Sequence, residues 1–339
     1  MRVLPWPLWL SNPYLSRFCR EIEARGVELV MRPRRVGMRE LERGDWVHLH
    51  WPGGPLISTH RWLYAARIRR FGRFVRGAKR RGLRVAWTAH NLYPHDDPHP
   101  ELGRRARLEL MGSLDHVFVH FPSAITTIAD ELGYRGPTTI LPHGNYIDDY
   151  GQLGDRSAAR AQLGLPAEGF VALMLGQLRA YKGIREALSA FLAMAGEHDR
   201  LIIAGRPIGE VGPELALAAG DPRVIVRLGH VPDDQIAVYH AAADCFVAAH
   251  RATFTSGSAV MALSLGCPIV GPAVHHLAAL GPEPRLFASD GSVEGLSDAL
   301  RRRKAAGVID REQIREWARE QLAWASAGER AAAVFLAPP

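Results

Sequence analysis

The chain has 339 residues, of which 47% are hydrophobic and 23% charged, a composition typical of soluble globular proteins and sufficient for two domains. No stretch approaches the ~20 uninterrupted apolar residues of a membrane-spanning helix, and the N-terminal sequence does not read as a signal peptide. The three cysteines, Cys19, Cys245 and Cys267, have no metal-ligand spacing, so we expect a reduced cytoplasmic protein without a metal site. The formal charge of +7 predicts an anionic partner, which could be phosphate, lipid or nucleic acid.

The first half of the chain alternates short apolar runs with helical patterns. Strands are predicted at about 2–5, 27–31, 46–51, 85–89, 116–120 and 138–141, and helices at 13–24, 59–81, 100–112 and 123–132. This alternation predicts a parallel, doubly wound sheet, in which ligands bind beyond the carboxyl ends of the strands. Histidines recur in three loops at that edge, 50–54, 90–97 and 143–146, and we interpret the edge as functional rather than as a set of surface turns.

The predicted helix at 61–81 is strongly basic. It carries nine cations, namely Arg61, Arg67, Arg69, Arg70, Arg73, Arg76, Lys79, Arg80 and Arg81, and no acidic residue occurs between Trp46 and His95. The apolar residues at 64, 68, 71 and 75 share one face, which can pack on a core or lie on a membrane surface. We expect attraction to an anionic membrane surface through 61–81, with a solvated basic face as the alternative. Nucleic acid is not expected, because no nucleic-acid-binding module accompanies the charge.

A polar, glycine-containing segment at 146–155 predicts a hinge, after which a second series of strands and helices begins. Strands are predicted at about 170–175, 201–204, 224–227, 245–248, 268–270 and 286–287, and helices at 183–195, 212–219, 233–242, 257–265 and 293–306. We therefore expect one domain at 1–150 and a second at 151–311. The tail from about 312 to 339 is helical, and its tryptophans, Trp317 and Trp324, indicate that it packs.

Two loops of the second half suit a diphosphate. Arg179 and Lys182 follow the first strand, three residues apart, and Gly183 opens a helix. After the strand at 245–248, Thr255, Ser256, Gly257 and Ser258 precede another helix, whose first amide groups point at an incoming ligand. Cations and free amides together stabilise the charge that grows on a leaving diphosphate. The alternatives are an ordinary helix cap and two ordinary surface cations.

These features together resemble the GT-B class of nucleotide-sugar-dependent glycosyltransferases, a large retaining family that includes bacterial sucrose and lipid-linked mannosyltransferases. The resemblance covers nearly the whole chain in element order and is most specific at GQLRAYKGI, LIIAGRP and TSGSAVMALSLGCPIVGP. It implies two Rossmann-like domains facing across a cleft, with a C-terminal helix at about 312–339 that crosses back onto the first domain and would bring Trp317 and Trp324 against it. The first domain would bind the acceptor, and the second a UDP-, GDP- or dTDP-sugar, which is a co-substrate; no other cofactor is implied.

The resemblance also implies roles for individual residues. The donor diphosphate is assigned to Arg179, Lys182, Thr255, Ser256, Gly257 and Ser258, and the nucleotide to Gly176, Gly205, Arg206, His230 and Val231. Catalytic candidates on the first domain are His90, Asp96, Asp97 and His143, and the acceptor side is assigned to His50, Trp51, Asn91 and His95. An inverting enzyme needs a general base near the acceptor hydroxyl, and His90, His95, Asp96 and Asp97 are the candidates for it.

The sequence departs from the family pattern at one important place. Two glutamates eight residues apart usually contact the donor sugar and ribose, whereas the corresponding residues here are Thr253 and Met261. Neither accepts a hydrogen bond as a carboxylate does, so the retaining mechanism does not carry over. Some bacterial exopolysaccharide transferases that act on lipid-diphosphate acceptors are similar in having TSG in place of the glutamates.

The function we expect is therefore transfer of a hexosyl group to an acceptor hydroxyl of a lipid-linked, polysaccharide or glycoconjugate acceptor. Two alternatives remain: a nucleotide-sugar epimerase of the same fold, and a non-catalytic nucleotide-sugar or membrane-surface binding protein. A peripheral position on the inner face of the cell membrane is compatible with the basic helix. The donor base, the sugar, the stereochemical outcome and the oligomeric state do not follow from the sequence.

Overall fold

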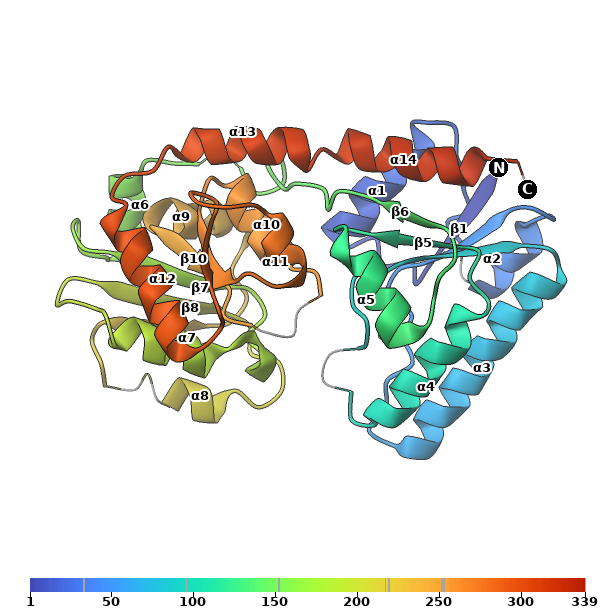
Figure 1. The fold of residues 1–339 in the computed structure, drawn as a ribbon, viewed down its shortest axis with the longest axis horizontal. Helices are drawn as coiled ribbons and strands as arrows, with labels where there is room; N and C mark the ends of the chain where they lie inside the picture. The colour runs from blue at the N-terminus through green and yellow to red at the C-terminus, as the bar shows by residue number, and fades with distance from the viewer. Residues whose placement is uncertain are drawn as a thin grey trace. The chain divides into compact units, whose positions relative to one another are not determined.

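A computed structural model describes residues 1–32, 34–94, 97–151, 153–216, 218, 220–250 and 254–338, and the side chains of residues 34–36 also lie outside the description. The chain forms two compact units (Figure 1). The first comprises Met1–Gly144 with Ala323–Pro339, and the second comprises Asn145–Leu322. Each unit contains one parallel six-stranded sheet with helices, so the prediction of two parallel α/β domains is confirmed.

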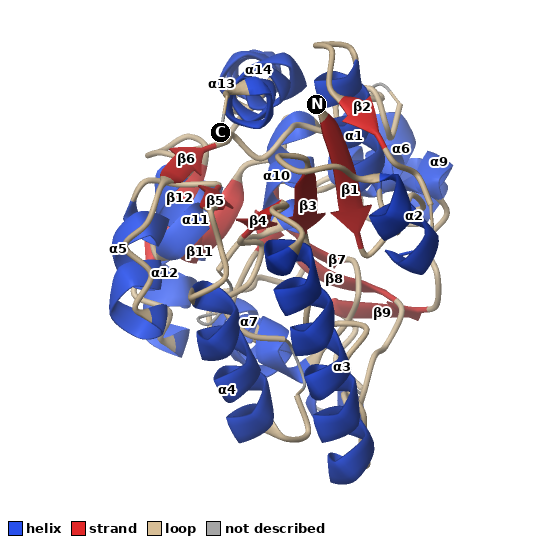
Figure 2. Ribbon diagram, turned by 90° about the vertical axis from the view of Figure 1, so that its right-hand side faces the viewer, coloured by secondary structure: helices blue, strands red, loops and turns tan. Residues whose placement is uncertain are grey.

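The sheet of the first unit has the order β2-β1-β3-β4-β5-β6, and every pairing is parallel. Its strands are β1 (Arg2–Trp6), β2 (Glu28–Leu29), β3 (Trp46–Leu49), β4 (Arg84–Thr88), β5 (His116–Val119) and β6 (Thr138–Ile140). Its helices are α1 (Pro13–Glu23), α2 (Arg34–Glu40), α3 (Arg61–Arg80), α4 (Pro100–Met111), α5 (Ser123–Leu132) and α14 (Trp324–Leu336). Figure 2 shows α1 and α14 on one side of this sheet and α3 and α4 on the other.

The two faces of the first sheet bury different kinds of side chain, because successive residues of a strand point to opposite faces. Trp46 and His48 of β3 contact Phe335 of α14, and Phe118 of β5 lies against the same ring. On the opposite face, Trp6 of β1 stacks on Phe71 of α3 at 4.9 Å. The face covered by α1 and α14 therefore carries histidines and aromatic rings.

The sheet of the second unit has the order β12-β11-β10-β7-β8-β9, again all parallel. Its strands are β7 (Val171–Leu175), β8 (Arg200–Gly205), β9 (Val224–Leu228), β10 (Cys245–Val247), β11 (Ile269–Pro272) and β12 (Leu286–Ser289). Its helices are α6 (Arg156–Leu163), the short η1 (Ala180–Lys182), α7 (Ile184–Leu192), α8 (Gly212–Ala216), α9 (Asp233–Ala242), α10 (Gly257–Ser264), α11 (His275–Ala279), α12 (Val293–Ala305) and α13 (Arg311–Gln321). No helix in the described ranges is long and apolar enough to cross a membrane.

The C-terminal tail is two helices that belong to different units. Asn145 ends α13: its backbone N–H and its side-chain Nδ2 both donate to the Leu322 carbonyl, at 2.8 and 2.9 Å. These bonds satisfy carbonyl groups that the helix leaves free, and the chain is extended at Ala323 before α14 begins. Trp317 consequently packs on the core of the second unit, whereas only Trp324 packs in the first. The expectation that both tryptophans lie against the first domain is therefore wrong.

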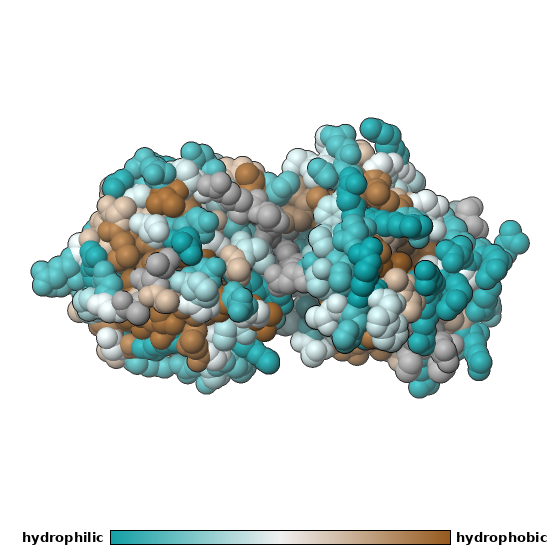
Figure 3. All heavy atoms as spheres, turned by 90° about the horizontal axis from the view of Figure 1, so that it is seen from below, coloured by the Kyte–Doolittle hydropathy of each residue, from teal (hydrophilic) through white to brown (hydrophobic). Residues whose placement is uncertain are grey.

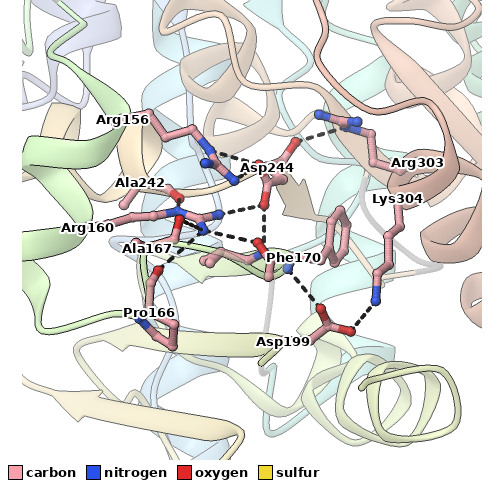
Figure 4. A network of polar contacts seen from close by, with 12 residues as sticks. Arg156, Arg160, Pro166, Ala167, Phe170, Asp199, Ala242, Asp244, Arg303 and Lys304 are labelled. Carbon is pink, nitrogen blue, oxygen red and sulfur yellow. Dashed lines mark hydrogen bonds and ion pairs between the residues drawn. The ribbon is translucent and has the colours of Figure 1, made fainter. Parts of the chain in front are cut away.

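A buried ion pair fastens the amino-terminal edge of the second sheet (Figure 4). Asp244, which precedes β10, accepts hydrogen bonds from the Arg160 guanidinium at 2.8 Å and from the Val171 backbone at 2.7 Å. Its other carboxylate oxygen accepts a hydrogen bond from Arg156, whose side chain is 44% exposed, against 1% for Arg160. The carboxylate thereby links α6 to β7 and β10.

We predict that Arg160→Leu lowers the free energy of unfolding of the second unit by roughly 3–5 kcal/mol, because it leaves a largely buried carboxylate without its enclosed partner. Arg156→Leu is the matched control, since it removes an exposed partner of the same carboxylate and is expected to change stability by less than about 1 kcal/mol. Urea denaturation followed by circular dichroism measures both. Equal effects of the two substitutions would contradict the assignment.

Candidate functional site

Two glycines lie at the carboxyl edge of the second sheet. Gly176 follows β7 and Gly205 ends β8, and both have positive φ, at 125° and 143°. A Cβ on Gly205 would lie 1.7 Å from the Gly176 carbonyl oxygen, so any side chain there would collide with backbone. The two neighbouring loops thus run close together, with no room for a side chain at Gly205.

The predicted diphosphate cations lie over this edge. Lys182 Nζ is 3.7 Å from the point where a Cβ on Gly176 would be, so its amine sits over the end of β7. Burial lowers the pKa of Lys182 to about 8, and repulsion from Arg179 contributes in the same direction. Arg179 donates hydrogen bonds to the Gln177 side chain at 3.2 Å. A bound anion would stabilise the charged form of Lys182 and so offset both causes of its lowered pKa.

The predicted helix terminus at 255–258 is a capped one. Ser256 is the N-cap of α10: its hydroxyl accepts a hydrogen bond from the Ala259 amide at 3.3 Å, and it lies 3.3 Å from the Ser258 hydroxyl. The Thr255 hydroxyl is buried without a hydrogen-bond partner within the described residues. The segment therefore combines a structural cap with a polar group left for a ligand. Thr253 lies outside the described residues, and Met261 is buried in the core of the second unit.

The residues predicted to bind the nucleotide do not all meet in one pocket. His230 and Val231 line a pocket of about 230 Å³ together with Gly229, Arg227 and Tyr239. Arg206 is exposed just after β8, where its carbonyl accepts a hydrogen bond from the Leu178 amide at 2.8 Å. Gly205 connects the two places, since its carbonyl accepts a hydrogen bond from Gly229 at 3.0 Å.

In the first unit, four histidines follow adjacent strands at the carboxyl edge: His50 after β3, His90 after β4, His120 after β5 and His143 after β6. Three of them form a chain of hydrogen bonds. His50 Nδ1 lies 3.3 Å from His90 Nε2, His90 Nδ1 lies 3.2 Å from His120 Nε2, and His120 Nδ1 lies 3.1 Å from the Leu141 carbonyl oxygen. All four histidines are buried.

The end of this chain determines the tautomers of its members. A carbonyl oxygen only accepts, so His120 Nδ1 carries a proton, and in the neutral ring its Nε2 then accepts from His90 Nδ1. By the same step His50 donates from Nδ1 to His90 Nε2, which leaves the unprotonated Nε2 of His50 without a partner among the described residues. Burial lowers the pKa of His50 to about 3 and that of His90 well below its usual range, with repulsion from neighbouring histidines contributing for His90.

Aromatic rings enclose the histidine chain. Trp51 stacks on His90 with ring centres 4.3 Å apart, and Tyr14 of α1 meets the same ring edge-on at 4.6 Å. His143 contacts Tyr14 at 5.0 Å and, through Nδ1, lies 3.2 Å from the Gly144 carbonyl. Burial also lowers the pKa of His143, to about 4. His50, Trp51, His90 and His143 are therefore brought together as one cluster.

The remaining first-domain candidates lie elsewhere. Asp97 precedes α4, where one carboxylate oxygen accepts from the His99 amide at 2.9 Å and the other from the Tyr64 hydroxyl at 2.8 Å. Both oxygens are thus used in holding α4 against α3, an arrangement that suits a structural role. Asn91 is partly buried next to His90 in the chain. His95 and Asp96 lie outside the described residues.

The sequence analysis did not single out His120 or His48, which are both buried. His120 forms the end of the chain that bonds to the Leu141 carbonyl, and His48 of β3 shares a hydrogen bond of 2.8 Å with the Thr88 hydroxyl. The signal for His120 was present, since it directly follows a buried strand in the same way as His50. No group of three or more His, Cys, Asp or Glu side chains in the described ranges could hold a metal ion.

The basic helix is α3, and its apolar stripe packs on the core: Tyr64, Phe71 and Val75 are buried. Figure 3, which views the lower side of Figure 1, shows hydrophilic side chains gathered over the unit that carries α3. The sequence had suggested that the cations of this helix have no acid nearby. Two of them do pair with acids from other elements, Arg61 with Glu101 and Lys79 with Asp115. No ion pair involves the four central cations among the described residues; these are Arg69, Arg70, Arg73 and Arg76. Trp62 is 72% exposed beside them in the chain.

Known proteins resemble this chain at two levels: a family model matches most of the second unit, and curated relatives match most of the chain. Residues 169–303 match the model of a family described as Glycosyl transferases group 1. A GDP-mannose:glycolipid 4-beta-D-mannosyltransferase of Xanthomonas campestris pv. campestris is 26% identical over 277 residues, which cover 80% of this chain and 73% of that protein. A D-inositol 3-phosphate glycosyltransferase of Acidothermus cellulolyticus is also 26% identical, over 71% of this chain and 55% of its own length.

Solved structures share the fold. HepE from Anabaena in complex with UDP superimposes with a TM-score of 0.72 at 15% identity and 98% coverage of each chain. Sucrose-phosphate synthase from Thermosynechococcus elongatus has a TM-score of 0.67 at 18% identity, covering 98% of this chain and 94% of its own. At these identities the likeness shows the GT-B fold.

We predict that acid destabilises the first unit, because its buried histidines stay neutral when folded but bind protons when unfolded. With folded pKa values of about 3 to 4 for His50 and His143, stability is complete above about pH 6.5 and is lost as the pH falls toward 4. Each such histidine contributes a loss of about 2 kcal/mol between pH 7 and pH 5. Urea denaturation followed by tryptophan fluorescence reports on the first unit, since seven of the eight tryptophans lie there.

The matched variants for this test are His50→Gln and His60→Gln. The first removes a buried histidine and is expected to reduce the loss on acidification, whereas the second removes an exposed histidine and is expected to leave the loss unchanged. The same stability at pH 5 and pH 7 in the wild-type protein would show that the histidines are protonated when folded.

Proposed function

We propose that this chain, which has the GT-B fold, is a glycosyltransferase that moves a hexosyl group from a nucleoside-diphosphate sugar to a hydroxyl of a lipid-linked or glycan acceptor without a metal ion. The observation that carries the proposal is the partly desolvated Lys182 amine over the end of β7, with Arg179 in the same loop. A bound diphosphate would place negative charge beside both cations and favour the charged form of the Lys182 amine. Relatives support the substrate classes, because the Xanthomonas relative is named for GDP-mannose and a glycolipid, and HepE was solved with UDP.

The second unit would bind the donor at its carboxyl edge. Arg179 and Lys182 would neutralise the diphosphate as the bond to the sugar breaks, and the hydroxyls of Thr255, Ser256 and Ser258 with the amides of α10 would complete its contacts. Gly257 keeps the helix terminus free of a bulky side chain. The ribose and base would lie along Gly176, Gly205 and Arg206, toward the pocket lined by His230 and Val231.

The first unit would bind the acceptor at the histidine cluster, where His50, Trp51, His90, Asn91 and His143 gather. If the reaction inverts the configuration, the acceptor hydroxyl needs a base, and the histidine chain is one candidate. Its terminal lone pair is on His50 Nε2, which is enclosed and whose pKa burial lowers to about 3, so the chain would act as a base only if bound substrate favours its protonated form. Asp97 is less suited, since both its oxygens already accept hydrogen bonds. His95 and Asp96 remain candidates from the sequence.

We predict that Lys182→Met and Arg179→Met each lower kcat/KM for the donor about 10- to 150-fold, the equivalent of ~1.5–3 kcal/mol for a lost charge-assisted hydrogen bond. Arg319→Met removes the same charge from the surface of α13 and is expected to leave the kinetics unchanged. The measurement is release of nucleoside diphosphate from a panel of UDP-, GDP- and dTDP-sugars, with and without lipid extract.

The same panel separates the proposed transferase from its alternatives. A transferase releases nucleotide fastest when acceptor lipid or glycan is present and yields a new glycoside. Conversion of the sugar without an acceptor would indicate the epimerase, and donor binding without turnover would indicate a binding protein. Unchanged kinetics of both cation variants would remove the assigned donor site even if transfer is observed.

The four central cations of α3 support contact between the first unit and an anionic membrane surface. They lie on the exposed side of a helix whose opposite stripe is buried, and no carboxylate pairs with them among the described residues. Each Lys or Arg near an anionic surface gains about 1 kcal/mol. The exposed Trp62 could add a shallow apolar contact at the interface. A lipid-linked acceptor would then be presented near the unit that binds it.

We predict that the protein binds vesicles containing anionic lipid and that binding weakens steeply as salt rises, because exposed charges are screened over ~8–10 Å. Replacing Arg69, Arg70, Arg73 and Arg76 together by Glu is expected to abolish sedimentation with the vesicles and to lower transfer to a lipid-linked acceptor. Hydrolysis of the donor in solution is expected to remain. As a control, Arg61→Glu alters a cation already paired with Glu101 and is expected to have a smaller effect. If the wild-type protein does not bind such vesicles at low salt, the result would indicate a soluble acceptor.

A further inference from the structure

A pocket lies at the amino-terminal edge of the second sheet, at the other end of the strands from the loops that carry Arg179 and Thr255. Its free volume of about 360 Å³ falls within the range of roughly 300–1,000 Å³ that is typical of small-molecule sites. The lining residues precede β7, β10 and β11 or belong to α6, to α13 and to the end of α12 with the segment after it. All of them are described and all belong to the second unit, so the pocket is a feature of that unit alone.

The lining is strongly positive. Four cations and a single acid, Asp244, line the pocket, which is a formal excess of three positive charges among these described residues. The cations are Arg156, Arg303, Lys304 and Arg311. Two partners outside the lining, Arg160 on Asp244 and Asp199 on Lys304, carry opposite charges and leave this excess unchanged. The Asp244 carboxylate is already engaged by two arginines, so the charge that the pocket lacks is negative.

Arg303, in the last turn of α12, is a buried cation that has no carboxylate partner within the described ranges. It is 5% exposed, and its Nε and Nη1 donate to the backbone carbonyls of Asp244 and Gly307 at 3.0 and 2.9 Å. Its Nη2 has no acceptor among the described residues and is not one of the enclosed polar atoms, so it stays open to a ligand. Since a guanidinium only donates, an oxyanion is the group that this nitrogen can bind.

Arg311 brings a second desolvated cation to the same pocket. Its three guanidinium nitrogens donate to backbone carbonyls at the carboxyl ends of α9 and α10. Burial lowers the pKa of Arg311, and repulsion from Arg303 and Arg156 contributes in the same direction. The contacts with helix ends account for Arg311, whereas they leave Nη2 of Arg303 unused. An anion in the pocket would offset the repulsion among these cations.

The rest of the lining is largely apolar. Phe170 and Pro268 are buried, and Val308 and Ile309 come from the segment that follows α12. Val308 is fully exposed although it lines the pocket, so an apolar group bound there would remove its side chain from water. Figure 4 shows Phe170 together with the charged side chains around Asp244. The pocket therefore suits a ligand with one anionic and one apolar part.

We propose that this pocket binds a small organic oxyanion, a phosphate or a carboxylate attached to an apolar group. Nη2 of Arg303 would donate to the oxyanion, and Arg156 and Lys304 would supply further positive charge. Phe170 and Val308 would contact the apolar group. The site lies away from the proposed donor site and does not rest on the proposed function. Because its residues join α6 and α12 to the starts of three strands, binding would stabilise the second unit.

Titration of the whole protein with phenyl phosphate tests the site. The probe is the pair of Val308 methyl resonances in protein with ¹³C-labelled valine methyl groups, identified with Val308→Ile, because a bound phenyl ring would shift them. We expect a saturable shift in the wild-type protein. At constant ionic strength, inorganic phosphate and phenol are each expected to compete only at about tenfold higher concentration, since each lacks one of the two recognised parts. Benzoate is the second probe: tighter binding of phenyl phosphate indicates a phosphorylated ligand, and tighter binding of benzoate a carboxylic acid.

Variants of the lining locate the response. Arg303→Met is expected to abolish the saturable shift, and Arg156→Met, at a position that is 44% exposed, to weaken phenyl phosphate about fivefold. If Arg303→Met does not fold, Arg156→Met decides. Arg301→Met removes an exposed cation of the same helix outside the lining, and Lys182→Met alters the proposed donor site; both are expected to bind as the wild-type protein does.

The proposal is overturned if phenyl phosphate and benzoate both leave the Val308 resonances unshifted, or if phenol binds as tightly as they do. It is also overturned if the Arg303 and Arg156 variants bind like the wild-type protein. A protein that transfers no sugar would remove the proposed function and leave this result standing.

Discussion

Parallel pairing of strands places all their carboxyl ends at one edge of a sheet, and the arrangement of chemical groups in this protein depends on that constraint. In the first unit a histidine lies within three residues of the ends of β3, β4, β5 and β6, and adjacent strands bring three of these histidines into a chain of hydrogen bonds. In the second unit the ends of β7 and β8 approach so closely that Gly205 tolerates no Cβ. The opposite edge of that sheet is held by the ion pair of Asp244 and Arg160. This ion pair and the loops that carry the candidate site therefore lie at opposite ends of the strands.

Desolvation then determines the charge of each group at these edges. The histidines of the first unit are enclosed by aromatic rings and stay neutral, which allows the Leu141 carbonyl to order their tautomers through a chain of three rings. Lys182 is less enclosed and keeps a pKa of about 8, so an anion bound beside it would favour the protonated amine. Arg107 stays charged although buried, because the intrinsic pKa of a guanidinium is too high for desolvation to neutralise it. These differences give the first unit a neutral histidine edge and a separate buried charge, and the second unit a cationic edge.

The basic helix α3 illustrates how tertiary contacts divide one sequence feature into parts. Arg61 and Lys79, near its ends, pair with acids from other elements, and the apolar stripe between is buried on the sheet. The central arginines, Arg69, Arg70, Arg73 and Arg76, remain exposed without an ion pair among the described residues, on the side of the helix away from the buried stripe.

The sequence by itself determined the two parallel α/β units, because strand and helix periodicities are local and recur throughout both halves. It also determined the cations of the loop after β7 and the Ser256 cap, since turn and cap residues act on their immediate neighbours. The tertiary structure decided which side chains meet. His120 joins His50 and His90 only because β5 pairs with β4, and Asp97 is engaged by Tyr64, which lies 33 residues earlier in the chain. The break between α13 and α14 depends on Asn145, and the unpaired state of Arg107 on the lack of any acid facing α4 within hydrogen-bond distance among the described residues. Such contacts join residues far apart in the chain, and no local pattern encodes them.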